Sequence, residues 1–370
     1  MINLTDPANS VLVYADGAFS NKAREKYPLR AKTADGYIRY ATTRILGVID
    51  ASSDEGNVSE VLGIRDDIPI YHSLVEYVEN GGKIPAILLI GVAPSGGGVD
   101  NTLLRDIRYA IEHGINIVSG MHYELNNDTE LKKLADMHQV SMWDVRVPPD
   151  DIAVASCKAY QIKKPIVLTC ASDAAIGKMT VGFELERILA QRNMQGELIA
   201  TGQTAIMVKG KGISIDRVIG DFMPGAVEKL LIESEKTNPA NRFYLIEGQG
   251  GLLHPGYAPV TLALLHGGMP THAILIHRPQ RKHSIGSKLI KLPDPVTTMQ
   301  LYKQSALPIR IPIFLGIALH TKGMGDDEAK DCINRIHEET ELPVEDMIRF
   351  PTGALADALE SAVVHYEAEV

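Results

Sequence analysis

The sequence predicts an α/β protein made of two successive parallel-sheet units, the second of which begins with a phosphate-binding loop. Three observations lead to this prediction. Short apolar runs alternate with segments of helical periodicity, a proline-containing segment interrupts the alternation near residue 150, and a small-residue loop closing on Gly177-Lys178 follows one apolar run. Such alternation is typical of parallel strands joined by helices.

In the first half, the apolar runs at 11–14, 45–49, 86–90 and 115–118 predict parallel strands flanked by helices. Polar or glycine-rich loops follow some of these strands, notably 16–18 and 91–98. Ligands of open α/β sheets bind at the carboxyl ends of the strands. The first half could therefore hold a site of its own.

A domain boundary is predicted near residue 150, where Arg146-Val-Pro-Pro149 and two aspartates interrupt regular structure. This gives domains at 1–150 and 151–370. A closing helix is expected around 353–366. The strands expected in the second domain are 166–169, 197–200, 243–246, 273–276 and 311–315.

Composition and charge narrow the class of protein. The 370 residues suffice for two domains, and 45% hydrophobic with 22% charged residues is an ordinary globular composition. A net charge of -9 disfavours nucleic acid as a partner, because duplex binding relies on clustered Lys and Arg side chains.

The cysteines and the apolar runs indicate the compartment. Three widely spaced cysteines fit no metal-ligand pattern and favour a reducing environment. The sequence has no signal-peptide pattern and no apolar run of membrane-spanning length. We expect a soluble cytoplasmic protein with no membrane partner.

The segment 166–180 carries the main functional prediction. An apolar strand, a small-residue loop and Gly177-Lys178 at the start of a helix form the layout in which backbone N–H groups and a lysine surround a phosphate. The alternative is a plain strand-turn-helix corner. The residues expected to bind the phosphates of a cofactor are Ser172, Asp173, Ala174, Ala175, Ile176, Gly177, Lys178, Met179 and Thr180.

The loop departs from the usual G-x-x-x-x-G-K-[ST] spacing in two places. Ser172 stands where that pattern has glycine, and Met179 stands where it has the hydroxyl that binds magnesium, with the nearest hydroxyl at Thr180. The loop therefore lacks, at the usual position, the hydroxyl that normally binds magnesium.

Two acidic residues belong to polar clusters, 202–225 and 247–255, that are expected at strand ends. Asp221 could hold a magnesium ion or could simply cap the following helix. Glu247 lies directly after the strand 243–246 and before several glycines, the arrangement in which a carboxylate faces bound phosphates or a metal-bound water. A capping role is its alternative.

Histidines and cations supply the other candidates. His254 could act as a base, although a histidine in an apolar stretch is often a hydrogen-bonded core residue, and His266 and His122 are weaker candidates. Lys32 and Arg39 could bind a substrate carboxylate, or could form the solvated face of a helix.

Several motifs together resemble one bacterial family, the family that includes D-glutamate N-acetyltransferase and many members known only as a domain of unknown function. The resemblance covers nearly the whole chain in order. The motifs are 31–36 (AKTADG), 91–97 (GVAPSGG), 146–149 (RVPP), 173–180, 201–204 (TGQT), 220–222 (GDF) and 247–255 (EGQGGLLHP).

The resemblance implies a Rossmann-like N-terminal domain and a P-loop NTPase-like domain similar in pattern to dethiobiotin synthetase. It also implies acetyl transfer from acetyl-CoA to the amine of D-glutamate, feeding a racemase that acts on the N-acetylated product. The loop at Gly177-Lys178 would then hold the phosphates of coenzyme A. A symmetric homo-oligomer is expected of such an enzyme.

The roles of individual residues follow from the chemistry rather than from the resemblance. The ammonium of the amino acid must lose a proton, so His254 or Glu247 is expected to be the base. The N–H groups of 248–251 or 96–98 could stabilise the oxyanion. Lys32, Arg39 and Arg146 are expected to bind the carboxylates of the amino acid.

Two other functions stay open at this point. One is an ATP-dependent enzyme in the manner of dethiobiotin synthetase, with Thr180 and Asp221 as ligands of Mg²⁺ and with Lys178 and Glu247 beside ATP. The other is a nucleotide-binding protein without catalytic activity.

Overall fold

The computed structural model describes residues 2–92 and 98–369. The chain divides into two compact units, the first made of 1–148 with 202–214 and the second of 149–201 with 215–370. The chain therefore leaves the second unit after Thr201 and re-enters it at Ile215. The sequence patterns gave no sign of this excursion.

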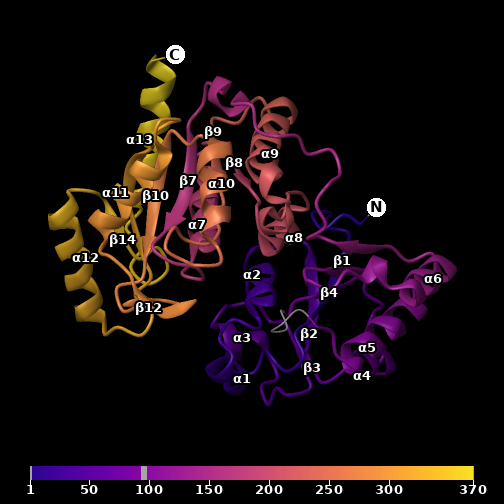
Figure 1. Ribbon diagram of the computed structural model, residues 1–370. Coiled ribbons are helices and arrows are strands. Elements are labelled where there is room, and N and C mark those ends of the chain that lie inside the picture. The colour runs from indigo at the N-terminus through magenta and orange to yellow at the C-terminus, as the bar shows by residue number, and fades with distance from the viewer. Residues whose placement is uncertain (1, 93–97, 370) are drawn as a thin grey trace. The chain divides into compact units, whose positions relative to one another are not determined.

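Parallel strands form the sheet of the first unit (Figure 1). Within its described residues, six strands pair in the order β3-β2-β1-β4-β5-β6. This is the order of doubly wound folds, whose ligands bind where the order reverses, here between β1 and β4. The strands are β1 (Ser10–Tyr14), β2 (Arg44–Ile49), β3 (Ile70–Tyr71), β4 (Ile87–Ile90), β5 (Asn116–Ser119) and β6 (Met142–Asp144).

The helices of the first unit begin mostly at side-chain caps. Ser20, Asn57, Ser73, Asp100 and Asp128 each accept a hydrogen bond from an N–H group in the first turn of a helix. The helical segments are α1 (Asn21–Lys26), α2 (Lys32–Tyr40), α3 (Val58–Leu62), α4 (Leu74–Glu79), α5 (Asn101–Glu112), the 3₁₀ turn η1 (Leu125–Asn127), α6 (Thr129–His138) and α8 (Gln203–Lys209). The last of these comes from the excursion and packs against α2.

The second unit has its own parallel sheet, with the order β14-β13-β10-β7-β9-β8 among the described strands. The strand before the predicted phosphate loop, β7, therefore lies in the interior of the sheet, between β10 and β9. Both main sheets are parallel, as the sequence predicts. The strands are β7 (Ile166–Ala171), β8 (Gly196–Ile199), β9 (Phe243–Ile246), β10 (His272–His277), β13 (Ile313–Leu319) and β14 (Val344–Glu345).

Helices alternate with these strands along the chain, as in a βαβ arrangement. The segment predicted to close the fold is helical, although it extends a few residues further than expected. The helical segments are η2 (Lys158–Gln161), α7 (Lys178–Gln191), η3 (Ile215–Arg217), η4 (Gly220–Phe222), α9 (Met223–Thr237), α10 (Ala258–Gly268), α11 (Pro295–Ala306), α12 (Asp326–Thr340) and α13 (Ala354–Glu369).

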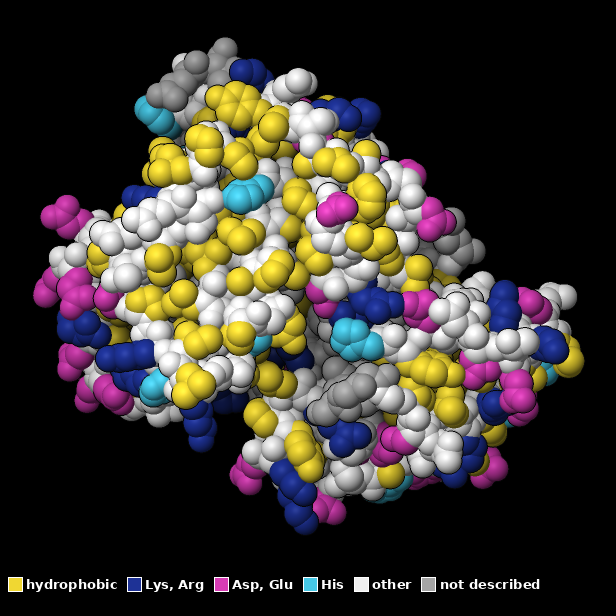
Figure 2. All heavy atoms as spheres, viewed as in Figure 1, with side chains coloured by type: hydrophobic (Ala, Val, Ile, Leu, Met, Phe, Trp, Pro, Cys, Tyr) yellow, Lys and Arg dark blue, Asp and Glu magenta, His cyan; other side chains and the backbone are white. Residues whose placement is uncertain are grey.

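A separate antiparallel hairpin interrupts the alternation after β10. It consists of β11 (His283–Ser284) and β12 (Ser287–Lys291). On the face seen in Figure 2, Lys and Arg side chains lie around this hairpin.

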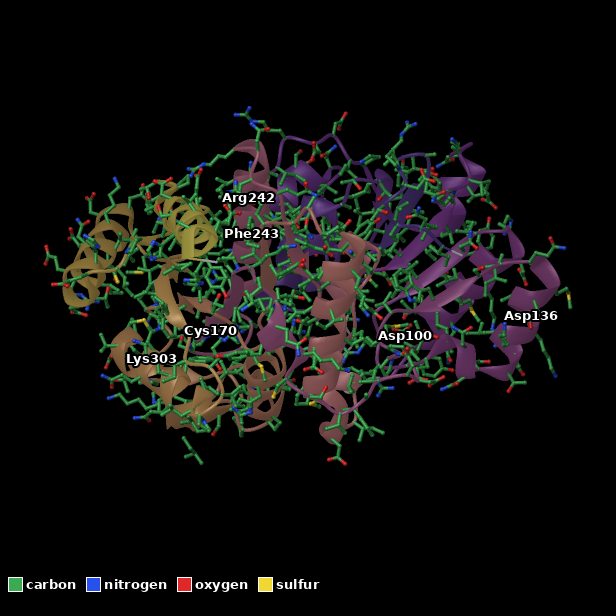
Figure 3. The ribbon with its side chains drawn as sticks, turned by 90° about the horizontal axis from the view of Figure 1, so that it is seen from above. Asp100, Asp136, Cys170, Arg242, Phe243 and Lys303 are labelled. Atoms are coloured by element: carbon green, nitrogen blue, oxygen red, sulfur yellow. The ribbon has the colours of Figure 1, made fainter. Side chains whose placement is uncertain are left out.

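The core of the second unit is apolar and tightly packed around β7. Cys170 is buried there, and its burial raises the pKa of its thiol far above the ordinary value (Figure 3). Phe243 packs against Gly196, where a Cβ would overlap its ring. In the described part of the chain, no helix has both the length and the apolar character needed to cross a membrane.

Candidate functional site

The loop between β7 and α7 has the conformation of an anion cradle. Ala175 and Gly177 adopt positive φ angles of 53° and 110°, which turn successive N–H groups inward, and only Gly177 does so without a side-chain penalty. The N–H groups of residues 174–177 donate to no acceptor in the part of the chain that the structure describes. These donors and the 14-residue helix α7 can bind a phosphate.

Lys178 links this loop to the glycine segment after β9. Its Nζ atom donates to the carbonyl oxygens of Asp173, at 3.0 Å, and Gly250, at 2.6 Å. The side chain is 7% exposed. Lys178, the side chain predicted to contact a phosphate, is therefore held where the ends of two strands meet.

The carboxylate of Asp173 bonds to residues of its own unit. Its buried carboxylate accepts hydrogen bonds from Arg281 Nη1 (3.2 Å), Ser284 Oγ (3.1 Å) and the N–H of Ile285 (2.8 Å). Arg281 Nη1 also donates to the carbonyl of Ala174, at 2.6 Å. Asp173 thus ties the hairpin segment to the loop with its side chain.

The first residue of the loop and the residues after the lysine are also positioned by the fold. Ser172 donates its N–H to Ile276, and its hydroxyl lies 3.1 Å from Nδ1 of His277. Burial lowers the pKa of His277 to about 4, so this imidazole is neutral at pH 7. Met179 is buried and Thr180 is half-buried in the first turn of α7.

Glu247 directly follows β9 and precedes the glycine segment that Lys178 contacts. Its side chain is 4% exposed, and Oε2 accepts a hydrogen bond from the N–H of Thr201, at 3.0 Å. The next residue must be glycine, because a Cβ at Gly248 would overlap the carbonyl oxygen of Thr169 and lie 2.8 Å from Cδ of Lys178. The close approach of this segment to Lys178 depends on that glycine.

His254 packs against the hairpin that Asp173 anchors. Its ring stacks on Tyr257 with centroids 4.3 Å apart, and a Cβ at Gly286 would lie 2.5 Å from Nε2. The N–H of Gly256 donates to Nδ1, at 3.1 Å. Accepting this bond places the proton of a neutral ring on Nε2. His266 instead joins α10 to the carbonyl of Ser305, at 2.7 Å, which is a packing role.

Asp221 is exposed in the short turn η4. Its carboxylate makes no hydrogen bond or ion pair with any described residue. Across residues 2–92 and 98–369, no three His, Cys, Asp or Glu side chains gather in a way that could hold a metal ion.

The cations predicted to bind substrate all belong to the first unit. Lys32 begins α2 and Arg39 lies in its last turn, so the helical rise separates them by about 10 Å. Arg39 donates to the carbonyl of Leu62, at 2.8 Å. Arg146 is buried and donates to Oε1 of Gln203, at 3.0 Å.

The crevice between β1 and β4 is partly described. The N–H of Ala34 donates to the carbonyl of Gly91, at 3.1 Å, so the start of α2 lies against the end of β4. Thr33 and Thr204 are in hydroxyl contact at 3.3 Å. Gly96 and Gly97, named above as possible oxyanion donors, lie outside the described residues.

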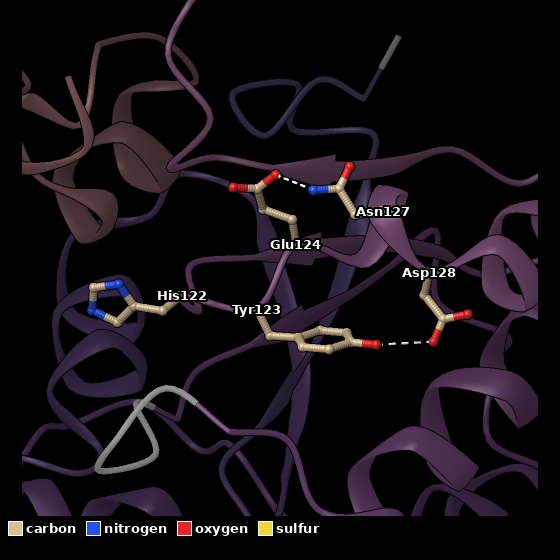
Figure 4. Close-up of a pocket in the computed structure, with 5 residues that line it drawn as sticks. All are labelled: His122, Tyr123, Glu124, Asn127 and Asp128. Atoms are coloured by element: carbon tan, nitrogen blue, oxygen red, sulfur yellow. Dashed lines mark hydrogen bonds between the residues drawn. The ribbon is translucent and has the colours of Figure 1, made fainter. Parts of the chain in front are cut away.

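An open hollow of about 340 Å³ follows β5 in the same unit (Figure 4). Its polar side chains bond to one another: Tyr123 donates to Asp128 at 2.9 Å, and Asn127 donates to Glu124 at 2.6 Å. His122 lies on its rim (Figure 4). We assign no ligand to the hollow.

Sequence reasoning missed the contribution of residues 278–291. The charge pattern of this part of the chain can be read from the sequence, since no Asp or Glu occurs between Glu247 and Asp294 while five Lys or Arg residues do. The contact of this segment with the loop could not be predicted from the sequence, because Arg281 and Asp173 are 108 positions apart.

Comparisons with known proteins agree along the chain. The family model described as a "Domain of unknown function (DUF1611_C) P-loop domain" matches residues 153–356, and the "(DUF1611_N) Rossmann-like domain" matches residues 52–148. Two proteins named D-glutamate N-acetyltransferase, from Pseudoalteromonas sp and Tritonibacter scottomollicae, are each 34% identical over 278 residues. Those alignments cover 75% and 74% of this chain and 81% and 80% of the relatives.

A solved structure is similar over almost the full length. The crystal structure of a DUF1611 family protein from Anabaena variabilis has 32% sequence identity and a TM-score of 0.87. The match covers 95% of this chain and 99% of that protein.

Proposed function

Because the chain belongs to the DUF1611 family, we propose that it is an N-acetyltransferase that moves the acetyl group of acetyl-CoA to the amino group of D-glutamate. The observation that carries this proposal is the pair of relatives named D-glutamate N-acetyltransferase, each 34% identical over about three quarters of the chain.

The residues of the β7–α7 loop fit the phosphates of a coenzyme. The N–H groups of 174–177 lack acceptors among the described residues, and Lys178 brings a positive charge to the same loop. Acetyl-CoA supplies the acetyl group as a thioester. The protein's task at this loop is to grip and orient, which requires donors and positive charge.

Met179 supports gripping over phosphoryl transfer. The usual hydroxyl at this position binds the magnesium ion of a bound nucleotide. A loop that holds a pyrophosphate without transferring a phosphoryl group can replace that hydroxyl with a buried apolar side chain.

Glu247 is the base in this proposal. It lies at a strand end directly before Gly248, which approaches Lys178, and its Oε2 accepts hydrogen bonds from the N–H and the hydroxyl of Thr201. An ionised carboxylate can accept the proton that the ammonium of D-glutamate must lose. His254 is less suited, because its Nδ1 lone pair already accepts the N–H of Gly256.

Backbone donors of the same segment can stabilise charge on the reacting carbonyl. The N–H of Gly248 is taken by Oγ1 of Thr169, at 2.9 Å. We assign stabilisation of the oxyanion to the N–H groups of Gly250 and Gly251, because a backbone N–H group donates a hydrogen bond whatever the protonation state of the site. Lys32 and Arg146 stay proposed as partners of the acceptor's carboxylates.

One experiment separates the candidate functions. The pure protein is incubated with D-glutamate and either acetyl-CoA or Mg-ATP, while free thiol, ADP and N-acetylglutamate are followed. Thiol release that requires D-glutamate supports the acetyltransferase. ADP formation without thiol would overturn it in favour of an ATP-dependent enzyme, and silence in both assays with a ligand-induced rise in Tm would indicate a binding protein.

A further inference from the structure

The segment 278–291, called the basic segment below, stands out by charge. The chain carries a net charge of -9, yet its residues 248–293 contain no Asp or Glu. The cations in this stretch are Arg278, Arg281, Lys282, Lys288 and Lys291. The basic segment therefore makes a local region of positive charge in an acidic protein.

The fold fixes the basic segment beside the phosphate loop. Ser172 donates its N–H to Ile276, at 3.1 Å, two residues before Arg278. Arg281 donates to Ala174, and Ser284 and Ile285 donate to Asp173. The buried carboxylate of Asp173 thus anchors the segment along the carboxyl end of β10, and Figure 2 shows Lys and Arg side chains around its hairpin.

Among the cations of the basic segment, Arg278 lies nearest to the end of β10. Its charge has no counter-ion among the described residues. It follows β10 directly and is half-buried, and its guanidinium makes no hydrogen bond or ion pair with any described residue. Burial and the neighbouring Arg281 lower its pKa. An arginine that is partly desolvated beside another arginine favours an anionic ligand.

A second unsatisfied group lies on the adjacent strand. His320 follows β13, donates its N–H to His277 at 2.9 Å, and has a buried Nδ1 atom with no partner in the described part of the chain. His277 directly precedes Arg278 and pairs with Leu319, the residue before His320, so Arg278 and His320 follow neighbouring positions of two paired strands. Two unmet polar groups, the Arg278 guanidinium and Nδ1 of His320, therefore belong to residues at the carboxyl ends of two neighbouring strands.

We propose that Arg278, with the basic segment and His320, forms a subsite for a phosphomonoester, and that its ligand is the 3′-phosphate of the coenzyme whose pyrophosphate lies in the β7–α7 loop. This rests on the proposed function. Coenzyme A carries a pyrophosphate and a separate phosphomonoester, which matches two neighbouring anion sites. The oxygens of a phosphomonoester can accept hydrogen bonds from the guanidinium and from Nδ1 when that nitrogen carries the proton of the ring.

The test compares CoA with dephospho-CoA, which lacks that phosphate. Dissociation constants of both are measured by calorimetry, and kcat and KM are measured with both acetyl thioesters. The wild type is expected to prefer CoA by about 10- to 100-fold, the range of a hydrogen bond to a charged group. Arg278→Gln should remove most of this preference by weakening CoA alone, and Arg278→Lys should restore part of it.

Lys303→Gln, an exposed cation on α11 of the same unit (Figure 3), is the matched control and should keep the preference. Equal wild-type affinity for the two coenzymes would overturn the subsite, as would an Arg278→Gln effect on the KM of D-glutamate in place of the coenzyme. A wild type that binds CoA better than dephospho-CoA without transferring acetyl groups would refute the proposed function and leave the subsite standing.

Discussion

The Nζ atom of Lys178 lies 2.6 Å from the carbonyl oxygen of Gly250, which joins the first turn of α7 to the glycine segment that follows β9. The same lysine donates to Asp173 inside the loop. A bound phosphate would compete with these neutral carbonyl oxygens for the ammonium. The lysine is thus already positioned between the two segments proposed to hold coenzyme and base.

Lys178→Ala should weaken binding of the coenzyme and leave the amino acid largely unaffected. Removing a charged donor costs about 1.5–3 kcal/mol, so the Kd for CoA should rise by at least about tenfold. Calorimetry with CoA and the KM for D-glutamate measure the two effects, with Lys303→Ala as control. An unchanged coenzyme affinity would count against the role of the loop.

Glu247→Gln should lower kcat by about 10²- to 10⁴-fold, because it removes the proposed base while keeping similar volume and a hydrogen-bond acceptor. Coenzyme affinity should change little. His254→Gln is the comparison and should cost much less. Steady-state kinetics and a pH profile of kcat/KM measure these effects. A Glu247→Gln enzyme with near wild-type kcat would show that another residue is the base.

Gly248→Ala should destabilise the protein strongly, because the added Cβ would overlap the carbonyl oxygen of Thr169. Overpacking of this kind costs about 1–3 kcal/mol or more. Gly220→Ala is the control, since its Cβ would meet no atom within 4 Å. Urea unfolding measures both, and equal stability of the two variants would contradict the close approach of the glycine segment.

Asp173→Asn should destabilise the second unit by about 3 kcal/mol or more, because Arg281 would lose a buried counter-ion. Hydrogen exchange in the 281–291 hairpin should also rise, because its anchor is weakened. Asp136→Asn breaks an exposed pair with Lys132 and should cost less than about 1 kcal/mol. Unchanged exchange in the hairpin would show that other contacts hold it.

Acidification should destabilise the protein between pH 6.5 and pH 4. Burial lowers the pKa of His272 and of His277 to about 4, below the ordinary 6.5, so the unfolded chain binds protons in this window that the folded chain does not. The stabilisation is complete above pH 6.5, is lost as the pH falls, and amounts to at most about 3 kcal/mol for each histidine.

Urea titrations from pH 7 to pH 4.5 measure this slope. His277→Gln should reduce it, and His283→Gln, at an exposed position, should not. A free energy of unfolding that stays constant over the window would contradict the burial of these two histidines.

Much of the fold could be predicted, because apolar runs mark strands that helices cover. The runs at 11–14, 45–49, 86–90 and 115–118 are β1, β2, β4 and β5, and the family assigned from the motifs is confirmed by the comparisons. The strands β3, β6 and β14 were missed because two or three residues make no recognisable run. The excursion at 202–214 was missed because helical periodicity does not say against which sheet a helix packs.

The candidate site was predictable where it follows strand ends. Lys178 and the Gly250 segment come together because β7 and β9 are neighbours in a parallel sheet. The hydrogen bonds of Asp173 with Arg281 and Ser284 join residues that are more than a hundred positions apart in the sequence. No local pattern records such contacts, so the orientation of a loop carboxylate required the structure.

The most direct test of the central claim is NMR detection of the product formed from D-glutamate and acetyl-CoA labelled with ¹³C in the acetyl group. If the protein is this acetyltransferase, a labelled N-acetyl-D-glutamate signal grows in step with free thiol and is lost in Glu247→Gln. Thiol release without a labelled amide, or label on a compound other than the amino acid, would contradict it.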